Sequence, residues 1–356
     1  MNEYSPFLKL KQNEITAIKK LDPPDRKTII PLLELPRDDK KYTEGELIRK
    51  IDGIVKKMEN GLESDFTFYI DNYEEPDEIK IHKNDNYLYM LESFKGFNMI
   101  PIFGFDRIDS HNSIAISYAN KMTKKIALRI TFDYFDSFLA YIKDLESMLG
   151  VLNSDVSCIV LLDCKYIDNS MLNNRVSSTI KIINNILSLT RFSKIVISGS
   201  TIPEPLSIGS KVKTGTNVSI PRNEIILFKE ITAKFPKTNF VFGDYTVISP
   251  GYAELTIEPK YLQNIMTPKI IYSLLDSHYY SRGKALKPYG SAQYFKQAED
   301  IMKKSFFRGK DYSWGDYFLY ERAKKKTINI TPSSIIGPEV NAHIKFMITE
   351  IQKGSI

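Results

Sequence analysis

The feature that most constrains the fold is a repeated unit, in which a short apolar run ends at a polar residue and a helix-period segment follows. The runs are continuous rather than alternating, as Cys158–Asp163 and Asn239–Asp244 illustrate. A strand has this pattern when helices bury both of its faces. Alternation of strands and helices predicts parallel pairing through right-handed crossovers. We therefore expect an α/β protein built around a parallel sheet.

About eight such runs lie between Phe7 and Phe242, which is the number that closes a TIM-barrel-like (β/α)8 fold. We expect the strands at 7–10, 29–34, 66–71, 99–104, 126–130, 158–163, 194–199 and 239–244. A further run, Lys269–Ser273, makes the closing strand ambiguous, because it could either complete the barrel or begin an extension. An open doubly wound parallel sheet is the competing fold.

The pattern changes from Pro268 onward, where segments rich in Gly and aromatic residues surround one expected helix at 292–304. We therefore expect a (β/α)8-like barrel at 1–265 and a C-terminal α+β extension at 266–356 that packs on the barrel. The stretch Ser200–Pro221 is rich in Pro, Gly, Ser and Thr. We expect it to form a long loop on the face where the strands end.

The composition is that of a globular protein, with 42% hydrophobic and 26% charged residues. No apolar run approaches the roughly 20 residues that cross a bilayer, and the first residues do not resemble a signal peptide. Cys158 and Cys164 would lie about 20 Å apart in an extended strand, too far for a disulfide. A reducing, cytoplasmic location is the expectation. The net charge of +6 permits an anionic partner without requiring one.

Polar residues end most of the expected strands, and in a barrel these ends converge on one mouth where active sites form. The acidic members are the candidate catalytic groups: Glu34, Asp71, Asp163 and Asp244. Several carboxylates around one axis could hold a divalent cation such as Mg²⁺, or two of them could act as acid and base. The structural interpretation is that strands stop where burial stops, and that Asp or Ser there often caps the next helix.

Other residues could bind an anion. Arg129 and Lys9 lie at expected strand ends and could orient a phosphate or a carboxylate. Arg282 lies in a Ser-Arg-Gly-Lys segment that also reads as a surface turn. The basic residues of 303–310 and 324–326 could contact nucleic acid, although a solvated basic surface is the ordinary interpretation. The 4 histidines do not have zinc-ligand spacing, and no dinucleotide, phosphate-loop or Gly-x-Ser-x-Gly signature is present.

A set of short motifs resembles the "Beta protein" family of phages and bacteria. The motifs are Pro6–Gln12, Pro31–Glu34, Ile197–Ser200, Phe242–Tyr245, Ser281–Gly283, Ser313–Asp316 and Asn341–Ile344. The resemblance spans nearly the whole chain and supplies no catalytic assignment. It implies a mobile-element or anti-phage context. It also directs attention to strand-end residues, namely Lys9, Lys11, Glu34, Ser198, Ser200, Asp244 and Tyr245, and to Arg282 and Asp316 in the C-terminal part.

Two functional hypotheses remain open. In the first, the mouth is an enzyme-like site, such as a metal-assisted hydrolase, nuclease or phosphodiesterase, that binds a nucleotide or nucleic acid in phage–host conflict. Its ligand-binding residues would be Lys9, Lys11, Arg129, Ser198, Ser200, Tyr245 and Arg282. In the second, the barrel is a noncatalytic adaptor, sensor or immunity component that binds a protein partner encoded nearby. Carboxylates around a metal-sized gap would favour the first hypothesis, and carboxylates all paired to Arg or Lys would favour the second.

Overall fold

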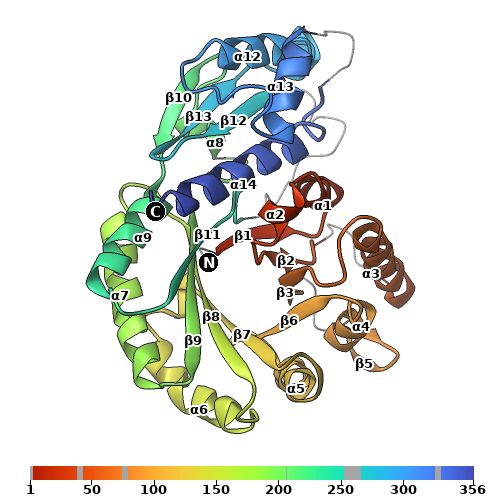
Figure 1. Ribbon diagram of the computed structural model, residues 1–356, viewed down its shortest axis with the longest axis vertical. Coiled ribbons are helices and arrows are strands. Elements are labelled where there is room, and N and C mark those ends of the chain that lie inside the picture. The colour runs from red at the N-terminus through yellow and green to blue at the C-terminus, as the bar shows by residue number, and fades with distance from the viewer. Residues whose placement is uncertain (1–2, 38–42, 74–78, 206, 252–265, 325–329) are drawn as a thin grey trace.

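The computed structural model describes residues 3–37, 43–73, 79–205, 207–251, 266–324 and 330–356. Eight parallel strands close into a barrel, and a smaller α+β lobe sits against one end of it (Figure 1). Around the barrel the order is β1, β11, β9, β8, β7, β6, β3 and β2. The bounds are β1 (Tyr4–Lys9), β2 (Leu32–Glu34), β3 (Thr67–Asp71), β6 (Asn98–Phe103), β7 (Lys125–Thr131), β8 (Ser157–Tyr166), β9 (Phe192–Ser200) and β11 (Phe240–Asp244).

The prediction of a TIM-barrel-like fold is confirmed, and every expected run forms a barrel strand. Closure comes from β1, which pairs in parallel with β2 on one side and with β11 on the other. An open doubly wound sheet is thereby excluded. The run Lys269–Ser273 does not take part in closure, because it forms β12 in the lobe.

Helices surround the barrel, as the apolar faces of the sequence segments between the strands predict (Figure 1). The main ones are α1 (Gln12–Lys19), α3 (Glu44–Glu59), α4 (Asn86–Ser93), α5 (Asp109–Tyr118), α6 (Ile142–Gly150), α7 (Leu172–Ser188) and α9 (Asn223–Lys234). Shorter elements are α2 (Pro23–Arg26), α8 (Ile208–Lys211) and the hairpin of β4 (Lys80–Ile81) and β5 (Asn84–Asp85). Helix α3 begins at Glu44, directly after its N-cap Thr43, because Thr43 and Glu46 form a reciprocal capping box.

The lobe contains an antiparallel sheet in the order β10 (Asn217–Pro221), β13 (Ser277–Arg282) and β12 (Lys269–Ser273). Its helices are α11 (Leu286–Tyr289), α12 (Gln293–Met302), α13 (Trp314–Lys324) and α14 (Ile336–Gln352). The expectation that Ser200–Pro221 is only a loop is therefore wrong, since the stretch contains α8 and β10. Its partner β13 is distant in sequence, so local composition gave no sign of the pairing.

Helix α14 joins the lobe to the barrel, lying across α1 and beside α13 and β12 (Figure 1). The Asn341 amide donates to the carbonyl of Ala17 in α1 at 2.9 Å and accepts from the backbone of Gly315 in α13 at 3.1 Å. A Cβ on Gly315 would lie 2.0 Å from the Pro338 carbonyl oxygen, so only glycine fits this helix crossing. No helix among the described residues has the length and apolar character needed to span a membrane.

Candidate functional site

The candidate site is the layer of inward-facing side chains at the carboxyl ends of the barrel strands. Side chains alternate across each strand, and the interior apolar cluster includes Phe7, Leu32, Tyr69 and Leu161. The residues two positions further along these strands therefore also face inward at the carboxyl end: Lys9, Glu34, Asp71 and Asp163. The β1–β2–β3 register places Lys9, Glu34 and Asp71 side by side.

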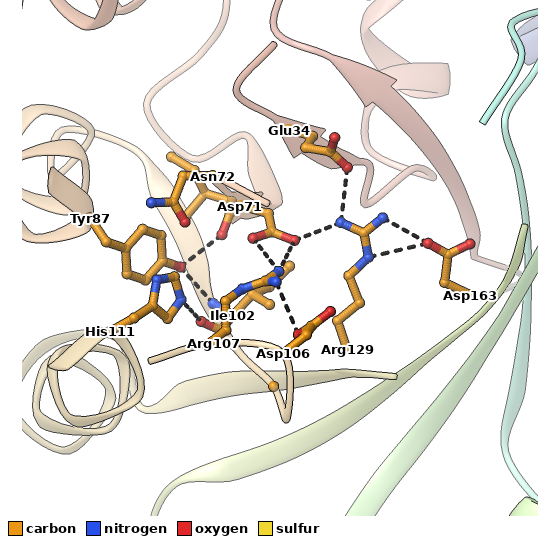
Figure 2. Close-up of polar contacts among 12 residues, drawn as sticks. Glu34, Asp71, Asn72, Tyr87, Ile102, Asp106, Arg107, His111, Arg129 and Asp163 are labelled. Atoms are coloured by element: carbon orange, nitrogen blue, oxygen red, sulfur yellow. Dashed lines mark hydrogen bonds and ion pairs between the residues drawn. The ribbon is translucent and has the colours of Figure 1, made fainter. Parts of the chain in front are cut away.

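Arg129 of β7 occupies the centre of this layer (Figure 2). Its Nη1 lies 2.9 Å from Glu34 Oε2 and 2.7 Å from Asp71 Oδ2. Its Nη2 lies 2.7 Å from Asp163 Oδ2, and Nε also donates to that oxygen at 3.3 Å. The arginine side chain is fully buried. One guanidinium thus connects carboxylates from three different barrel strands.

A second cation contacts each of the three carboxylates. Lys9 pairs with Glu34. Arg107 Nη2 donates to both oxygens of Asp71 at 2.8 and 2.9 Å, and its Nη1 lies 3.0 Å from Asp106. Lys165 Nζ lies 3.2 Å from Asp163. The carboxylates are therefore all matched by arginine or lysine, which is the arrangement that favours the noncatalytic hypothesis.

The half-buried ring of Tyr73 covers this layer. The guanidinium carbons of Arg129 and Arg107 lie 4.6 and 4.7 Å from the ring centroid, and Lys165 Nζ lies 4.6 Å from it. These distances are those of cation–π contacts. Burial raises the pKa of the Tyr73 hydroxyl to about 12, so Tyr73 is neutral at physiological pH. The cations are held between the carboxylates below and an aromatic ring above.

The ion pairs in this layer determine the charge state of its carboxyl groups. Burial alone would raise the pKa of each carboxyl group, but the neighbouring cations outweigh it. Lys9 and Arg129 lower the pKa of Glu34, and Arg107 and Arg129 lower that of Asp71 to about 2. Lys165 and Arg129 depress the pKa of Asp163 further. All three groups are therefore ionised at neutral pH, and none holds a proton to donate.

A tyrosine outside the barrel wall links the two strands next to Asp71. The Tyr87 hydroxyl donates to the Ile70 carbonyl at 2.8 Å and accepts from the Ile102 amide at 2.7 Å, bridging β3 and β6 (Figure 2). Pro101 in β6 has no amide hydrogen to contribute to this ladder. His111 stacks on Tyr87 with ring centroids 4.0 Å apart, and its Nε2 lies 3.0 Å from the Ile102 carbonyl. Burial lowers the pKa of His111 to about 4, so it is neutral.

The predicted ligand-binding residues are only partly assembled at the mouth. Tyr245 belongs there, since its hydroxyl donates to Asp163 Oδ2 at 2.7 Å. Ser198 is buried, and its hydroxyl has no hydrogen-bond partner within the described part of the chain. The Ser200 hydroxyl accepts from the Ile202 amide at 3.0 Å. Lys11 is exposed and precedes α1. Arg282 lies in the lobe, where it donates to the Val212 carbonyl at 2.5 Å and to Thr267 at 2.9 Å.

Asp244 ends a barrel strand as predicted but points away from the mouth. On β11, Val241 belongs to the barrel interior and Phe242 to the surrounding core, so Gly243 faces inward and Asp244 outward. Its carboxylate accepts from the Tyr4 hydroxyl at 2.5 Å, from Arg222 Nη2 at 2.7 Å and from His343 Nε2 at 2.9 Å. Asp244 therefore does not share a site with Glu34, Asp71 and Asp163.

Sequence reasoning missed this second network at the junction of barrel and lobe. Arg222 Nε donates to Glu224 at 2.7 Å while its Nη2 holds Asp244. The Ser273 hydroxyl lies 2.7 Å from His343 Nδ1 and 3.0 Å from His278 Nδ1. Burial lowers the pKa of both histidines. The contributing residues are far apart in the sequence, and no local motif signals that they meet.

Hydrogen bonds connect Ser273, His343 and Asp244 in the Ser–His–Asp sequence that acyl-transfer enzymes use. Their surroundings are nevertheless those of a structural contact between the barrel and the lobe. Ser273 is 2% exposed, and its hydroxyl is shared between two histidines. The adjoining cavity measures about 10 Å³, enough for about one water molecule. A substrate carbonyl has no room beside this hydroxyl.

The described residues contain no group of three or more His, Cys, Asp or Glu side chains that could hold a metal ion. At the mouth, the guanidinium of Arg129 fills the point toward which the carboxylates converge. Cys158 and Cys164 are free and buried. Arg107, Lys165 and Tyr73 were missed by the sequence analysis, although each lies within a few residues of an expected strand end, where such groups are to be sought.

The motifs that carry the family resemblance lie at three places in the fold: the barrel mouth, the junction and the lobe. Glu34 and Tyr245 lie at the mouth, Asp244 and His343 meet at the junction, and Asp316 accepts from the Tyr272 hydroxyl at 2.5 Å inside the lobe. No match was found among curated proteins. The model of the family described as Beta protein matches residues 4–349, nearly the whole chain. The chain therefore belongs to the Beta protein family.

Proposed function

We propose that this protein is a noncatalytic barrel that recognises a protein partner, as an adaptor, sensor or immunity component. The observation that supports this is the position of Arg129, whose guanidinium occupies the point where Glu34, Asp71 and Asp163 converge. In barrel enzymes, the substrate or metal meets the catalytic groups at this face. Here a side chain of the protein takes that place, and the carboxylates are already neutralised.

Metal-assisted hydrolysis fits this arrangement less well. A divalent cation at the mouth would have to displace a buried arginine and approach Arg107 and Lys165, which repel it. General acid–base catalysis needs two groups whose environments push their pKa values apart. At this mouth, neighbouring cations lower the pKa values of all three carboxyl groups together.

Recognition of a phosphate-bearing ligand, such as a nucleotide or nucleic acid, ranks second. Lys9, Arg107, Arg129 and Lys165 each have a carboxylate at ion-pair distance. Four carboxylates, those of Glu34, Asp71, Asp106 and Asp163, balance these four cations, so the described mouth offers no surplus of positive charge to attract a phosphate. Arg282, the predicted phosphate contact of the lobe, instead donates to Val212 and Thr267.

The biological setting that we propose is phage–host conflict in the cytoplasm. This part of the proposal rests on the context that family membership suggests, and not on the geometry of the site. The protein partner is expected to be encoded near this chain. Co-purification from the native host with and without the neighbouring genes measures whether such a partner exists.

The noncatalytic assignment is tested by a hydrolysis screen with Mg²⁺ or Mn²⁺ on single-stranded and duplex nucleic acids and on nucleoside triphosphates. Wild type is compared with Glu34→Ala, with Asp244→Ala, and with Asp106→Asn as a control at the edge of the cluster. We expect no metal-dependent turnover from any of these proteins. Turnover by wild type that Glu34→Ala abolishes, with an unchanged circular dichroism spectrum, would replace the proposal with the enzyme hypothesis.

A further inference from the structure

Strand β10 is an edge strand of the lobe sheet, since β13 is its only neighbouring strand among the described residues. Its five residues pair with β13 from Asn217 opposite Ser281 to Pro221 opposite Ser277. All five are exposed or partly exposed. An edge strand presents a row of backbone donors and acceptors that can pair with another extended chain.

The register identifies which backbone groups are available on that edge. The Arg282 amide donates to the Thr216 carbonyl at 3.0 Å, and the Arg222 amide donates to the Asp276 carbonyl at 2.9 Å. Because hydrogen-bonded residues alternate in an antiparallel pair, Val218 and Ile220 also direct their backbone groups toward β13. The N–H and C=O groups of Asn217 and Ser219 therefore point to the opposite side, where the described residues supply no partner strand.

A cleft of about 400 Å³ runs along this strand, on the face of the barrel where the strands end. One wall is β10, through Ser219 and Pro221, and the other is the segment that follows β8, including Tyr166 and Asp168. Asn223, which is 2% exposed, also lines the cleft and is held by hydrogen bonds to Ile167 and Asn169. The cleft thus combines a strand edge with a preformed wall of polar and apolar side chains.

The chemistry of the lining indicates the occupant. Hydroxyl and amide side chains share the lining with the apolar Ile167, Ile220 and Pro221, and the cation Lys211 lies 3.4 Å from Asp168. A wholly apolar segment would leave the hydroxyl and amide groups unpaired, which costs free energy. An extended segment that carries both polar and apolar side chains could pair its backbone with Ser219 and its side chains with the opposite wall.

We propose that the cleft beside β10 binds an extended peptide segment of a protein partner, with both polar and apolar side chains, which adds as a further strand to the lobe sheet. This is the β-addition mode of peptide recognition, in which backbone hydrogen bonds provide affinity and the side-chain contacts provide specificity. The inference rests on the proposed function, because it names the surface and the kind of partner of a binding protein. It places recognition beside the closed barrel mouth, on the lobe.

Two substitutions at one position test the proposal. Ser219→Pro removes the outward-facing N–H while leaving the β13-facing hydrogen bonds of Val218 and Ile220 in place, and proline is tolerated on edge strands. Ser219→Thr keeps the N–H and is the matched control. Random peptides displayed on a library are selected against wild type, and the affinities of the selected peptides for all three proteins are measured by fluorescence anisotropy.

We expect the selected peptides to bind wild type and Ser219→Thr alike and to lose about three- to tenfold in affinity for Ser219→Pro, as the loss of one backbone hydrogen bond implies. Hydrogen exchange of the Asn217 and Ser219 amides in wild type should slow when peptide is bound, a readout that does not depend on the folding of a variant. Equal binding to Ser219→Pro, unprotected amides or a failure to select any peptide would overturn the inference. So would a homodimer that Ser219→Pro dissociates in sedimentation, because a second copy would then be the occupant. Metal-dependent turnover would overturn the proposed function alone.

Discussion

Two buried arginines organise two different regions of this protein, and they do so in different surroundings. Arg129 lies inside the barrel among Glu34, Asp71 and Asp163, which come from three barrel strands. Arg222 lies outside the barrel wall and holds Asp244 and Glu224 next to two neutral histidines from the lobe. The first network ties barrel strands to one another. The second ties the barrel to the lobe.

Whether a carboxylate at a strand end belongs to the barrel mouth depends on the direction of its side chain as well as on its position in the strand. Asp163 and Asp244 both end barrel strands, but Asp163 faces the axis and Asp244 faces α14. Only the inward group joins the mouth. The two networks should therefore respond differently to substitution and to pH, which provides direct tests of their separation.

The largest effect is expected from Arg129→Met, which removes the central cation and leaves three buried carboxylates around an apolar side chain. Breaking a buried ion pair from one side typically costs about 3–5 kcal/mol. Urea denaturation should show a loss in the free energy of unfolding of that order. Lys303→Met, at an exposed pair with Glu299, is the control and should cost less than about 1 kcal/mol. A loss for Arg129→Met as small as that of the control would mean that the mouth cluster does not hold the barrel together.

Effects of intermediate size on the free energy of unfolding are expected from two tyrosine substitutions, one in each network. Tyr245 donates to Asp163 at the mouth, and Tyr4 donates to Asp244 at the junction. Hydrogen bonds to charged groups contribute about 1.5–3 kcal/mol. Tyr245→Phe and Tyr4→Phe should each lower the free energy of unfolding by about that amount, measured by urea denaturation. A loss at one site alone would show that one carboxylate does not depend on its hydroxyl donor.

The smallest effect expected is a difference in pH dependence. His343 is neutral in the folded protein because burial lowers its pKa, while an unfolded histidine titrates near pH 6.5. The unfolded state therefore binds more protons below about pH 6.5, and stability falls as the pH falls. His343→Gln should remove up to about 1.4 kcal/mol per pH unit of this slope as the pH falls below about 6.5, measured by urea denaturation at a series of pH values.

The mouth network should respond in a more acidic window. Asp163 has a folded pKa below its unfolded value of about 3.9. Its contribution to stability is therefore present above that value and is lost as the pH falls through the folded pKa. Asp163→Asn should change the slope of stability only as the pH falls toward and below about 4, whereas His343→Gln should already change it just below about pH 6.5. Identical windows for the two variants, in urea denaturation at a series of pH values, would contradict the separation of the networks.

Most of the barrel could be predicted from the sequence, because a strand covered on both faces leaves a continuous apolar run such as Cys158–Asp163. Strand β10 could not be predicted, since Val218 and Ile220 are its only apolar residues and β13 is distant in sequence. The rule that strand ends converge correctly placed Glu34, Asp71, Arg129 and Asp163 together. It failed for Asp244, because alternation along β11 was not applied.

The pairing of charges was beyond the sequence. Nothing local to Arg129 shows that it lies between acidic residues 95, 58 and 34 positions away. The same holds for the junction, where His343 meets a carboxylate 99 positions distant. Residue types at strand ends indicated that a polar layer would form. Only the packed arrangement shows that the layer is already neutralised and filled.

Arg129 occupies the meeting point of the barrel carboxylates, and we propose that it takes the place of a metal ion there. Electron paramagnetic resonance of Mn²⁺ added to the wild-type protein can decide this, because bound Mn²⁺ loses the spectrum of the free ion. We expect the spectrum of free Mn²⁺ for wild type and for Asp163→Asn alike. Stoichiometric Mn²⁺ binding by wild type that Asp163→Asn abolishes would contradict it.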